Sequence, residues 1–412
     1  MRLHPIAVVS LTAAASALAA CGGGNGDQPG ANAATASKQV TIYSSQPLQG
    51  TTGGQARGVI NGERLALAEH GGKGGACRVS YVPLDDSTAA AAQWDPAAVS
   101  ANARKALGDK SAIAYLGEFN SGASAVAIPI LNQMPLLEIS PSATYVGLTK
   151  AAGAAPGEPA KYYPSGRRTF GRVVPADNIQ AAAVVEYMKR EGTRRVFILN
   201  DAETYGSGLA QNVALDARRA GITVLANQRI DEKAANYRSL AQAVTSRDGD
   251  SVFFGGNTYG GAIQLWKDLY AANPQLKLFG PDGVAESSFY SQVGAPGRNT
   301  FITVSTLPPK YYPPAAQRFF AHYRARFGTA PETYAIYGYE AMSVVLDAMR
   351  RAKDCADRRQ VLDAFFATRD RRSVLGTYSI DRDGDTTLTR YGGYKIVGGQ
   401  LVFNTVLQPE GT

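Results

Sequence analysis

Residues 136–144 read Leu-Leu-Glu-Ile-Ser-Pro-Ser-Ala-Thr, a short apolar run followed by hydroxyl side chains at alternate positions. An apolar run of this length is typical of a buried strand. Buried strands rarely end in such a series unless hydroxyl groups and free backbone amides are needed at that point. The stretch therefore predicts both a strand of a central sheet and a polar site at its carboxyl end.

Strand-like and helix-like segments alternate on both sides of residues 136–144. A first series has expected strands at 40–44, 79–84, 113–116 and 136–139, and expected helices at 55–69, 96–107 and from 121. A second series has expected strands at 170–174, 196–199, 222–225, 252–254 and 276–279, and expected helices from 177 and at 208–220, 237–244 and 262–270. This order predicts an α/β fold with two doubly wound, parallel-sheet lobes.

The last part of the chain does not continue this alternation. An expected strand at 301–304 is followed by expected helices at 314–327 and 333–351 and expected strands at 375–380, 391–397 and 401–406. We expect residues 38–174 and 305–377 to form an N-terminal lobe, and residues 175–304 and 378–412 to form a C-terminal lobe. Several chain crossings would then make a multi-strand hinge between the lobes.

The first 37 residues are typical of export and not of a folded domain. Arg2 precedes an apolar run at 6–18 that is too short to span a bilayer, and Leu18-Ala-Ala-Cys21 follows. This order resembles the lipobox of bacterial lipoproteins, which implies a signal peptide at 1–20 and an acylated Cys21; an ordinary secretion signal with a chance cysteine is the alternative. Residues 21–37 lack large apolar side chains and are expected to form a flexible tether.

Composition restricts the partners of the mature chain. The chain has 412 residues with 45% hydrophobic side chains and a formal net charge of +8, which suits a globular protein near an anionic cell envelope. Paired arginines are spread along the chain and do not alternate with aromatic residues in one run, so nucleic-acid binding is not expected. Cys77 and Cys355 could form a disulfide in an exported protein or remain two separate buried thiols.

The strand-to-helix turns are the places where a doubly wound fold binds ligands. Turns of the first series, Gly-Glu-Phe-Asn-Ser-Gly-Ala-Ser at 117–124 and Ser-Pro-Ser-Ala-Thr at 140–144, offer hydroxyls and helix N-termini, which suit an anion. The turn Gly-Pro-Asp-Gly at 280–283 of the second series offers the carboxylate of Asp282, which suits a cation. A ligand that carries both charges would fit between two such lobes.

The order of these segments resembles the leucine/isoleucine/valine-binding proteins, which deliver amino acids to ABC transporters. The resemblance extends from about residue 39 to residue 403, through "QPLQGTTGGQARGVINGERLALAEHGGKGG", "YVPLDDST", "YLGEFNSGAS", "EISPSAT", "DAETYGSGL", "FFGGN" and "GPDGVAE". It implies a type I periplasmic binding protein fold, an extracytoplasmic and lipid-anchored location, a monomer, and an ABC permease as partner.

The resemblance also implies roles for particular residues. The hydroxyls of Ser121 and Thr144 would hold the carboxylate of the ligand, and Ser142 would give its backbone amide to the same group. Tyr205 would line the second lobe, and Asp282 would receive the ammonium group. The complete expected ligand-binding set is Ser121, Ser142, Ala143, Thr144, Tyr205, Asn257 and Asp282. Asp177 matches an acidic residue near the crossing between the lobes.

Each of these residues also has a purely structural interpretation. Serines at 140 and 142 could form a hydroxyl-capped turn, and Ser121 could cap a helix. The residues 280–283 make a good turn by themselves, Tyr205 could be a surface aromatic, and Asp177 could be an N-cap.

Two departures from the family weaken an apolar pocket for the ligand side chain. Asn257 stands where the family often has an aromatic residue, and residues 50–53 read Gly-Thr-Thr-Gly where an aromatic commonly covers the ligand. The side chain of the ligand is therefore left open, and a polar or unusual amino acid or an amide-like compound is possible. Glu118 could favour a cationic ligand, but we prefer a carboxylate placed at the N-terminus of the following helix.

Catalytic and metal-binding patterns are weak. After processing, His70 and His322 are the two histidines that remain, both on expected helices, and no Gly-x-Ser-x-Gly motif is present. Asp-Arg-Asp-Gly-Asp at 381–385 lacks the spacing and the distal Glu of a calcium loop, and a hairpin turn explains it. We therefore expect no catalytic residue, metal or cofactor, and predict a transport lipoprotein that closes on its ligand; a ligand sensor of the same fold that signals to a membrane partner is the alternative.

Overall fold

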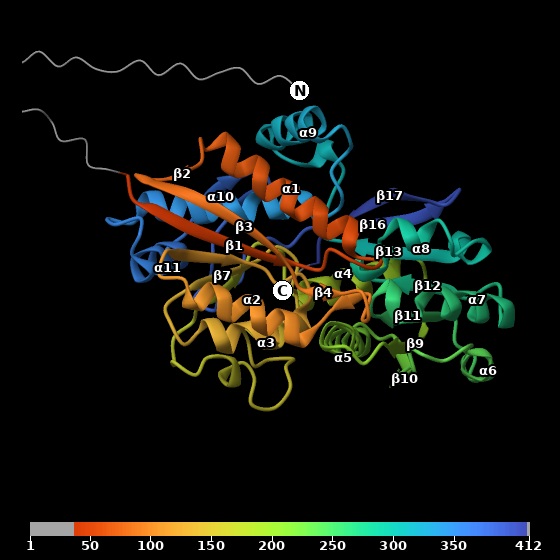
Figure 1. Ribbon diagram of the computed structural model, residues 1–412. Helices are drawn as coiled ribbons and strands as arrows, with labels where there is room; N and C mark the ends of the chain where they lie inside the picture. Colours follow the sequence, from red (N-terminus) through yellow and green to blue (C-terminus); the bar gives the residue numbers. More distant parts are fainter. Residues whose placement is uncertain (1–36, 410–412) are drawn as a thin grey trace, which may run out of the picture. The chain divides into compact units, whose positions relative to one another are not determined.

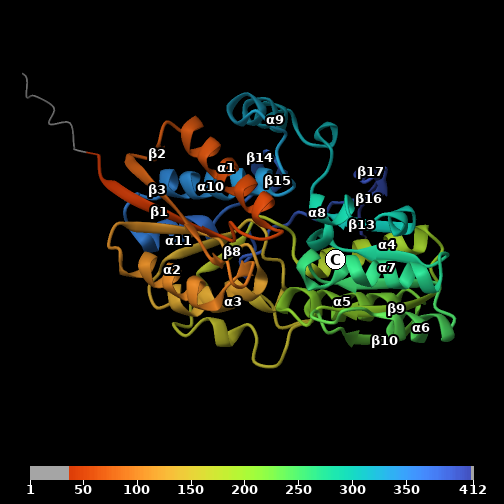
Figure 2. The same ribbon diagram turned by 45° about the vertical axis from the view of Figure 1, so that its right-hand side comes forward.

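The structure is a computed structural model that describes residues 37–409 of the chain. The predicted signal peptide, most of the predicted tether and Cys21 lie outside the described residues. Two large sheets with helices on both faces make up the described part (Figures 1 and 2). The predicted α/β fold with two doubly wound lobes is confirmed.

The first lobe is built on a six-stranded sheet. Its strands are β1 (Gln39–Gln46), β2 (Lys73–Gly74), β3 (Cys77–Asp85), β6 (Ala112–Leu116), β7 (Leu137–Ser140) and β8 (Phe170–Arg172), in the order β2-β3-β1-β6-β7-β8. All neighbours pair in parallel except β2, which is antiparallel to β3. A short pair, β4 (Ser87–Thr88) and β5 (Gln93–Trp94), stands apart from this sheet.

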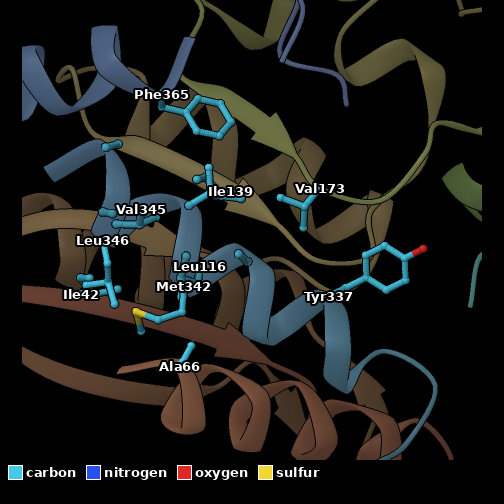
Figure 3. Close-up of a cluster of buried hydrophobic side chains, with 14 of the residues drawn as sticks. Ile42, Ala66, Leu116, Ile139, Val173, Tyr337, Met342, Val345, Leu346 and Phe365 are labelled. Carbon is cyan, nitrogen blue, oxygen red and sulfur yellow. The ribbon is translucent and has the colours of Figure 1, made fainter. Parts of the chain in front are cut away.

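Helices cover both faces of the first sheet because successive strand residues point in opposite directions. Ile42 of β1 packs in the cluster that holds α1 (Gly53–Glu69) and α10 (Ala335–Arg351), where Met342, Val345 and Leu346 are buried (Figure 3). Tyr43, the next residue of β1, packs on the other face with α2 (Pro96–Gly108) and α3 (Ser121–Leu131). The helices α9 (Pro314–Phe327) and α11 (Arg358–Phe366) add residues to the first cluster.

The second lobe is built on a seven-stranded sheet. Its strands are β9 (Arg195–Asn200), β10 (Thr223–Arg229), β11 (Ser251–Gly255), β12 (Lys277–Gly280), β13 (Thr300–Val304), β16 (Tyr391–Val397) and β17 (Gln400–Leu407), in the order β10-β9-β11-β12-β13-β16-β17. One face packs on α4 (Asp177–Arg190) and α5 (Thr204–Arg219), and the other on α6 (Arg238–Ser246) and α7 (Ala262–Ala272). A short helix, α8 (Ser287–Tyr290), follows β12.

The five parallel strands of each lobe have the same arrangement. Among these five, the second strand in chain order is followed across the sheet by the first, third, fourth and fifth strands, as in β3-β1-β6-β7-β8 and β10-β9-β11-β12-β13. Doubly wound sheets bind ligands beyond the carboxyl ends of their strands, where the winding direction reverses. This reversal lies between β1 and β6 in the first lobe and between β9 and β11 in the second.

The end of the chain contributes to both sheets. After β13 in the second sheet, α10 packs in the core of the first lobe, and β16 then returns as an antiparallel neighbour of β13. In the chain, a two-stranded hairpin of β14 (Arg371–Ser373) and β15 (Gly376–Tyr378) comes between α10 and β16. The exact residues at which the chain passes from one lobe to the other stay a prediction.

A disulfide joins Cys77, the first residue of β3, to Cys355, which follows α10 (S–S 2.05 Å, Cα–Cα 5.9 Å). Of the two arrangements that the sequence left open for these cysteines, the structure has the bridge. None of the helices within residues 37–409 combines the length and the apolar character that crossing a bilayer would require.

Candidate ligand-binding site

A small cavity lies where the turns of the two lobes meet. Its walls in the first lobe are Thr52, Gln55, Phe119, Asn120, Ser121, Ser142 and Tyr334, and in the second lobe Tyr205, Asn257, Asp282, Gly283 and Glu286. Most of these residues follow the carboxyl ends of β1, β6, β7, β9, β11 and β12, which is where this fold class binds ligands. The cavity volume is about 30 Å³, which is room for about two water molecules.

Most of the predicted site residues meet at this cavity. The lining includes Ser121, Ser142, Tyr205, Asn257 and Asp282. Ala143 and Thr144 are buried in the same turn as Ser142 but do not line the cavity. The carbonyl oxygen of Ala143 instead accepts from the buried guanidinium of Arg172 at 3.1 Å.

Two serine hydroxyls organise the turn that follows β7. Ser140 Oγ accepts the backbone N–H groups of Ser142 (3.1 Å) and Ala143 (2.7 Å), and its hydroxyl donates to the carbonyl of Glu118 (2.6 Å). The Ser142 hydroxyl donates to the carbonyl of Phe119 (2.5 Å). These bonds tie the turn after β7 to the turn after β6, so the structural interpretation of Ser140 is correct and Ser142 combines a structural contact with a place in the cavity wall.

Ser121 begins α3 and stands between this turn and the cavity. Its Oγ accepts the backbone N–H groups of Thr144 (3.2 Å) and Tyr145 (3.1 Å). A hydroxyl that accepts two bonds still has one proton to donate. Because Ser121 also lines the cavity, that proton is available to an acceptor inside it.

The carboxylate of Asp282 is fully buried and receives three donors. The hydroxyls of Tyr205 (3.0 Å) and Tyr334 and the amide nitrogen of Gln180 all point to it. Burial raises the pKa of Asp282, and these three hydrogen bonds lower it. A carboxylate that already has three donors and lines a cavity can still accept a cation from the cavity side.

The sequence did not identify two of these three donors. Tyr334 directly precedes α10, more than fifty residues after Asp282 in the chain, so only the tertiary fold brings it to the site. Gln180 lies three residues after Asp177 on α4, and this helical spacing places the two side chains on one face. This helical spacing from Asp177, an expected site residue, is the signal in the sequence that could have identified Gln180.

Asp177 is also buried near the site, although it does not line the cavity. Neither of its carboxylate oxygens has a hydrogen-bond partner among residues 37–409. Burial raises the pKa of Asp177 to about 8, and the negative charge of Asp282 raises it as well. Asp177 therefore holds its proton more strongly than an exposed carboxyl group does.

Glu286 is a second acidic residue of the cavity wall that the sequence did not assign. It lies four residues after Asp282 and is buried, and burial raises its pKa to about 7. The side chain of Gln55 donates to the carbonyl of Ala285 at 3.1 Å, so the start of α1 rests against this turn of the other lobe. Glu286 is the last residue of the motif "GPDGVAE". Because Glu286 follows the turn at 280–283, the sequence gave no reason to identify it as a ligand-binding residue.

Asn257 and Glu118, which the sequence singled out as residues that could affect ligand choice, have different places in the structure. Asn257 lines the cavity, and its backbone N–H and side-chain amide both point to Asp201 (2.9 and 3.4 Å). Glu118 lies outside the cavity wall and accepts from the Tyr115 hydroxyl (2.5 Å). Burial raises the pKa of Glu118 well above its usual value, and the interpretation of this residue as a carboxylate favoured by the helix N-terminus stays a prediction.

The acidic turn at 381–385 is neutralised by basic side chains. Asp385 pairs with Arg172 (2.8 Å) and Lys150 (3.0 Å), and Asp381 also pairs with Lys150 (3.0 Å). Within the described part of the chain, no group of three or more His, Cys, Asp or Glu side chains is placed to hold a metal ion.

Comparison with known proteins gives consistent results. The model of the periplasmic binding protein family matches residues 39–400. The Leu/Ile/Val-binding protein BraC3 of Rhizobium johnstonii is 27% identical over 367 residues, which cover 88% of this chain and 93% of the relative.

Solved structures show the same fold. A leucine binding protein LivK of Thermotoga maritima has a TM-score of 0.78 at 21% identity, covering 90% of this chain and 99% of its own. A solute binding protein of an ABC transporter from R. palustris, in complex with benzoate, has a TM-score of 0.72 at 20% identity, covering 90% and 97%. The predicted resemblance to leucine/isoleucine/valine-binding proteins is thus confirmed, and the chain belongs to the periplasmic binding protein family.

Proposed function

We propose that this protein is the extracytoplasmic substrate-binding component of an ABC transporter and captures an amino acid or a similar small zwitterion between its lobes. One observation carries the proposal most directly. Hydroxyl and amide groups of the first lobe and the carboxylate of Asp282 in the second lobe line the same cavity. Opposite poles of one dipolar ligand would find complementary groups on the two lobes.

The ligand carboxylate is assigned to the first lobe. The Ser121 hydroxyl has a proton to donate, and the turn that contains Ser142, Ala143 and Thr144 lies at the same wall. The ammonium group is assigned to Asp282, with Tyr205 and Tyr334 holding that carboxylate in place. Benzoate, the ligand of one structural relative, has no cation for Asp282, so an aromatic acid without an amine fits this cavity poorly.

Closure of the lobes is the proposed mechanism. A ligand drives closure only by the additional affinity that it has for the closed form, and contacts from the second lobe such as Asp282 supply that affinity. Direct bonds between the lobes, such as Gln55 to the carbonyl of Ala285, would form in the same step. Acylation of Cys21 would hold the protein at the membrane beside its permease, which stays a prediction.

The first experiment identifies the ligand. The full-length protein is purified in detergent and denatured, and any released small molecule is identified by mass spectrometry. Release of an α-amino acid or another small zwitterion is expected. Release of a carboxylic acid without a cationic group would contradict the proposal.

The second experiment tests Asp282 by isothermal titration calorimetry with the released ligand. Asp282→Asn should weaken binding by about 30-fold to more than 1,000-fold, because loss of one partner of a buried charge pair costs about 2–5 kcal/mol. Asp268→Asn is the matched control, since Asp268 is a buried acid of the second lobe that does not line the cavity. Unchanged affinity in the Asp282 variant would end the assignment.

A further inference from the structure

The cavity has a second acidic feature that a simple zwitterion does not use. We use the name acidic wall for three residues that line this cavity: Thr52, Gln55 and Glu286. The bond from Gln55 to the carbonyl of Ala285, the residue before Glu286, shows that these residues of two lobes lie against each other. The acidic wall is separate from the three donors that surround Asp282.

The charges of the cavity do not balance with a neutral amino acid. The lining given above includes two acidic side chains, Asp282 and Glu286, and no Lys, Arg or His. Within residues 37–409, no basic side chain forms an ion pair with Glu286. One ammonium group would pair with Asp282, and Glu286 would remain without a cation at a site where an unpaired charge is costly.

Thr52 gives an independent indication of a polar ligand group. Its side chain is only 3% exposed, it lines the cavity, and its Oγ1 has no hydrogen-bond partner within the described residues. Buried hydroxyls without a partner are rare in folded proteins. A ligand nitrogen that donates to Thr52 Oγ1 would satisfy this hydroxyl, and Glu286 in the same cavity wall would accept or pair with a cationic nitrogen.

We propose that the acidic wall binds a second cationic nitrogen on the ligand side chain, so that the preferred ligand is a short diamino acid. This inference rests on the proposed function and specifies its ligand class. Burial raises the pKa of Glu286 to about 7, so a nearby cation would favour its ionised form.

The test compares two ligands of nearly equal shape by calorimetry on the full-length protein in detergent. L-2,4-diaminobutyrate and L-norvaline differ in having an ammonium or a methyl group at the end of the side chain. Diaminobutyrate is expected to bind at least about 10-fold more tightly, since one desolvated charge pair contributes on the order of 1.4 kcal/mol or more. Glu286→Gln should abolish this preference, so that diaminobutyrate and norvaline bind the variant with similar affinity.

Two further variants make the test specific. Thr52→Val should weaken diaminobutyrate binding more than norvaline binding and so reduce the preference. Glu203→Gln is the matched control, because burial also raises the pKa of Glu203 to about 7 but this residue does not line the cavity. It should keep the full preference.

The outcomes separate this inference from the proposed function. Norvaline binding as tightly as diaminobutyrate to the unmodified protein would overturn the diamino acid and leave the zwitterion site intact. If neither compound binds and the released ligand is not a zwitterion, both proposals are wrong. The comparison on the unmodified protein decides the question even if a variant fails to fold.

Discussion

Arg172 and Asp385 form a buried ion pair behind the turn that carries Ser142, with Arg172 Nε donating to Asp385 Oδ1 at 2.8 Å. The same guanidinium donates to the carbonyls of Ala143 (3.1 Å) and Tyr145 (2.9 Å). Arg172 thus holds two carbonyls of the turn, while Asp385 holds Arg172. A segment close to the end of the chain therefore supports a wall of the cavity more than two hundred residues earlier.

Asp385→Asn should lower the free energy of unfolding by about 3–5 kcal/mol, because it leaves Arg172 buried without its charged partner. Urea denaturation followed by circular dichroism measures this change. Asp383→Asn is the control, since Asp383 lies at 3.8 Å from Arg168 at a more exposed position, and such a pair contributes about 0–1 kcal/mol. Equal stability of the two variants would contradict a supporting role for Arg172.

Ser121→Ala should weaken ligand binding by about 10-fold to 100-fold, because it removes the proposed donor and the acceptor of two backbone N–H groups. Calorimetry with the ligand released from the native protein gives the affinity. Ser124→Ala provides the matched control, since Ser124 is a buried serine of the same helix outside the cavity wall. A similar loss in both variants would point to disruption of α3 and not to a lost ligand contact.

Asp177→Asn should make stability depend less on pH. Burial raises the pKa of Asp177 to about 8 in the folded protein, so the folded state holds this proton more strongly than the unfolded state. The resulting stability is fully present below the unfolded pKa, near 4, and is lost as pH rises toward 8. Between pH 5 and pH 8, the free energy of unfolding of the unmodified protein should therefore fall more steeply than that of the variant.

Urea denaturation at several pH values within this range measures both slopes. Asp363→Asn, which makes the same substitution at an exposed position, serves as the control. Parallel slopes for the unmodified protein and Asp177→Asn would show that Asp177 titrates normally.

Replacing both Cys77 and Cys355 by alanine should lower the free energy of unfolding by about 2–5 kcal/mol, because the bridge constrains the unfolded chain across a long loop. The two cysteines are 278 residues apart. Adding a reductant to the native protein should have a similar effect, and adding it to the double variant should have none. Since neither cysteine lines the cavity, ligand affinity should not change.

The sequence predicted elements well where local patterns determine them. Helix α9 begins at Pro314 and ends at Phe327 as expected, because proline suits the first turn and Gly328, with φ of +74°, ends the helix. Helix α5 begins at Thr204, four residues earlier than expected, so Tyr205 lies on the helix and not in the preceding loop. The polar residues of its first turn concealed the apolar periodicity there.

The site was predictable only in part, for a physical reason. Ser121, Ser142 and Asp282 follow strands directly, so the rule for parallel sheets identifies them. Tyr334 and Gln180 reach the site from other segments, and their positions depend on the tertiary fold. Glu286 lay in a recognised motif, but its burial and the lack of a nearby cation appear only in three dimensions.

The path of the chain between the two sheets affects how the protein can be made. The second sheet is complete only when β16 and β17 join it, and the core of the first lobe needs α10, which starts at Ala335. Neither lobe can finish folding while the last fifth of the polypeptide is still being synthesised or translocated. A truncated product would expose apolar surface in both halves, so we expect quality-control proteases to degrade it rapidly.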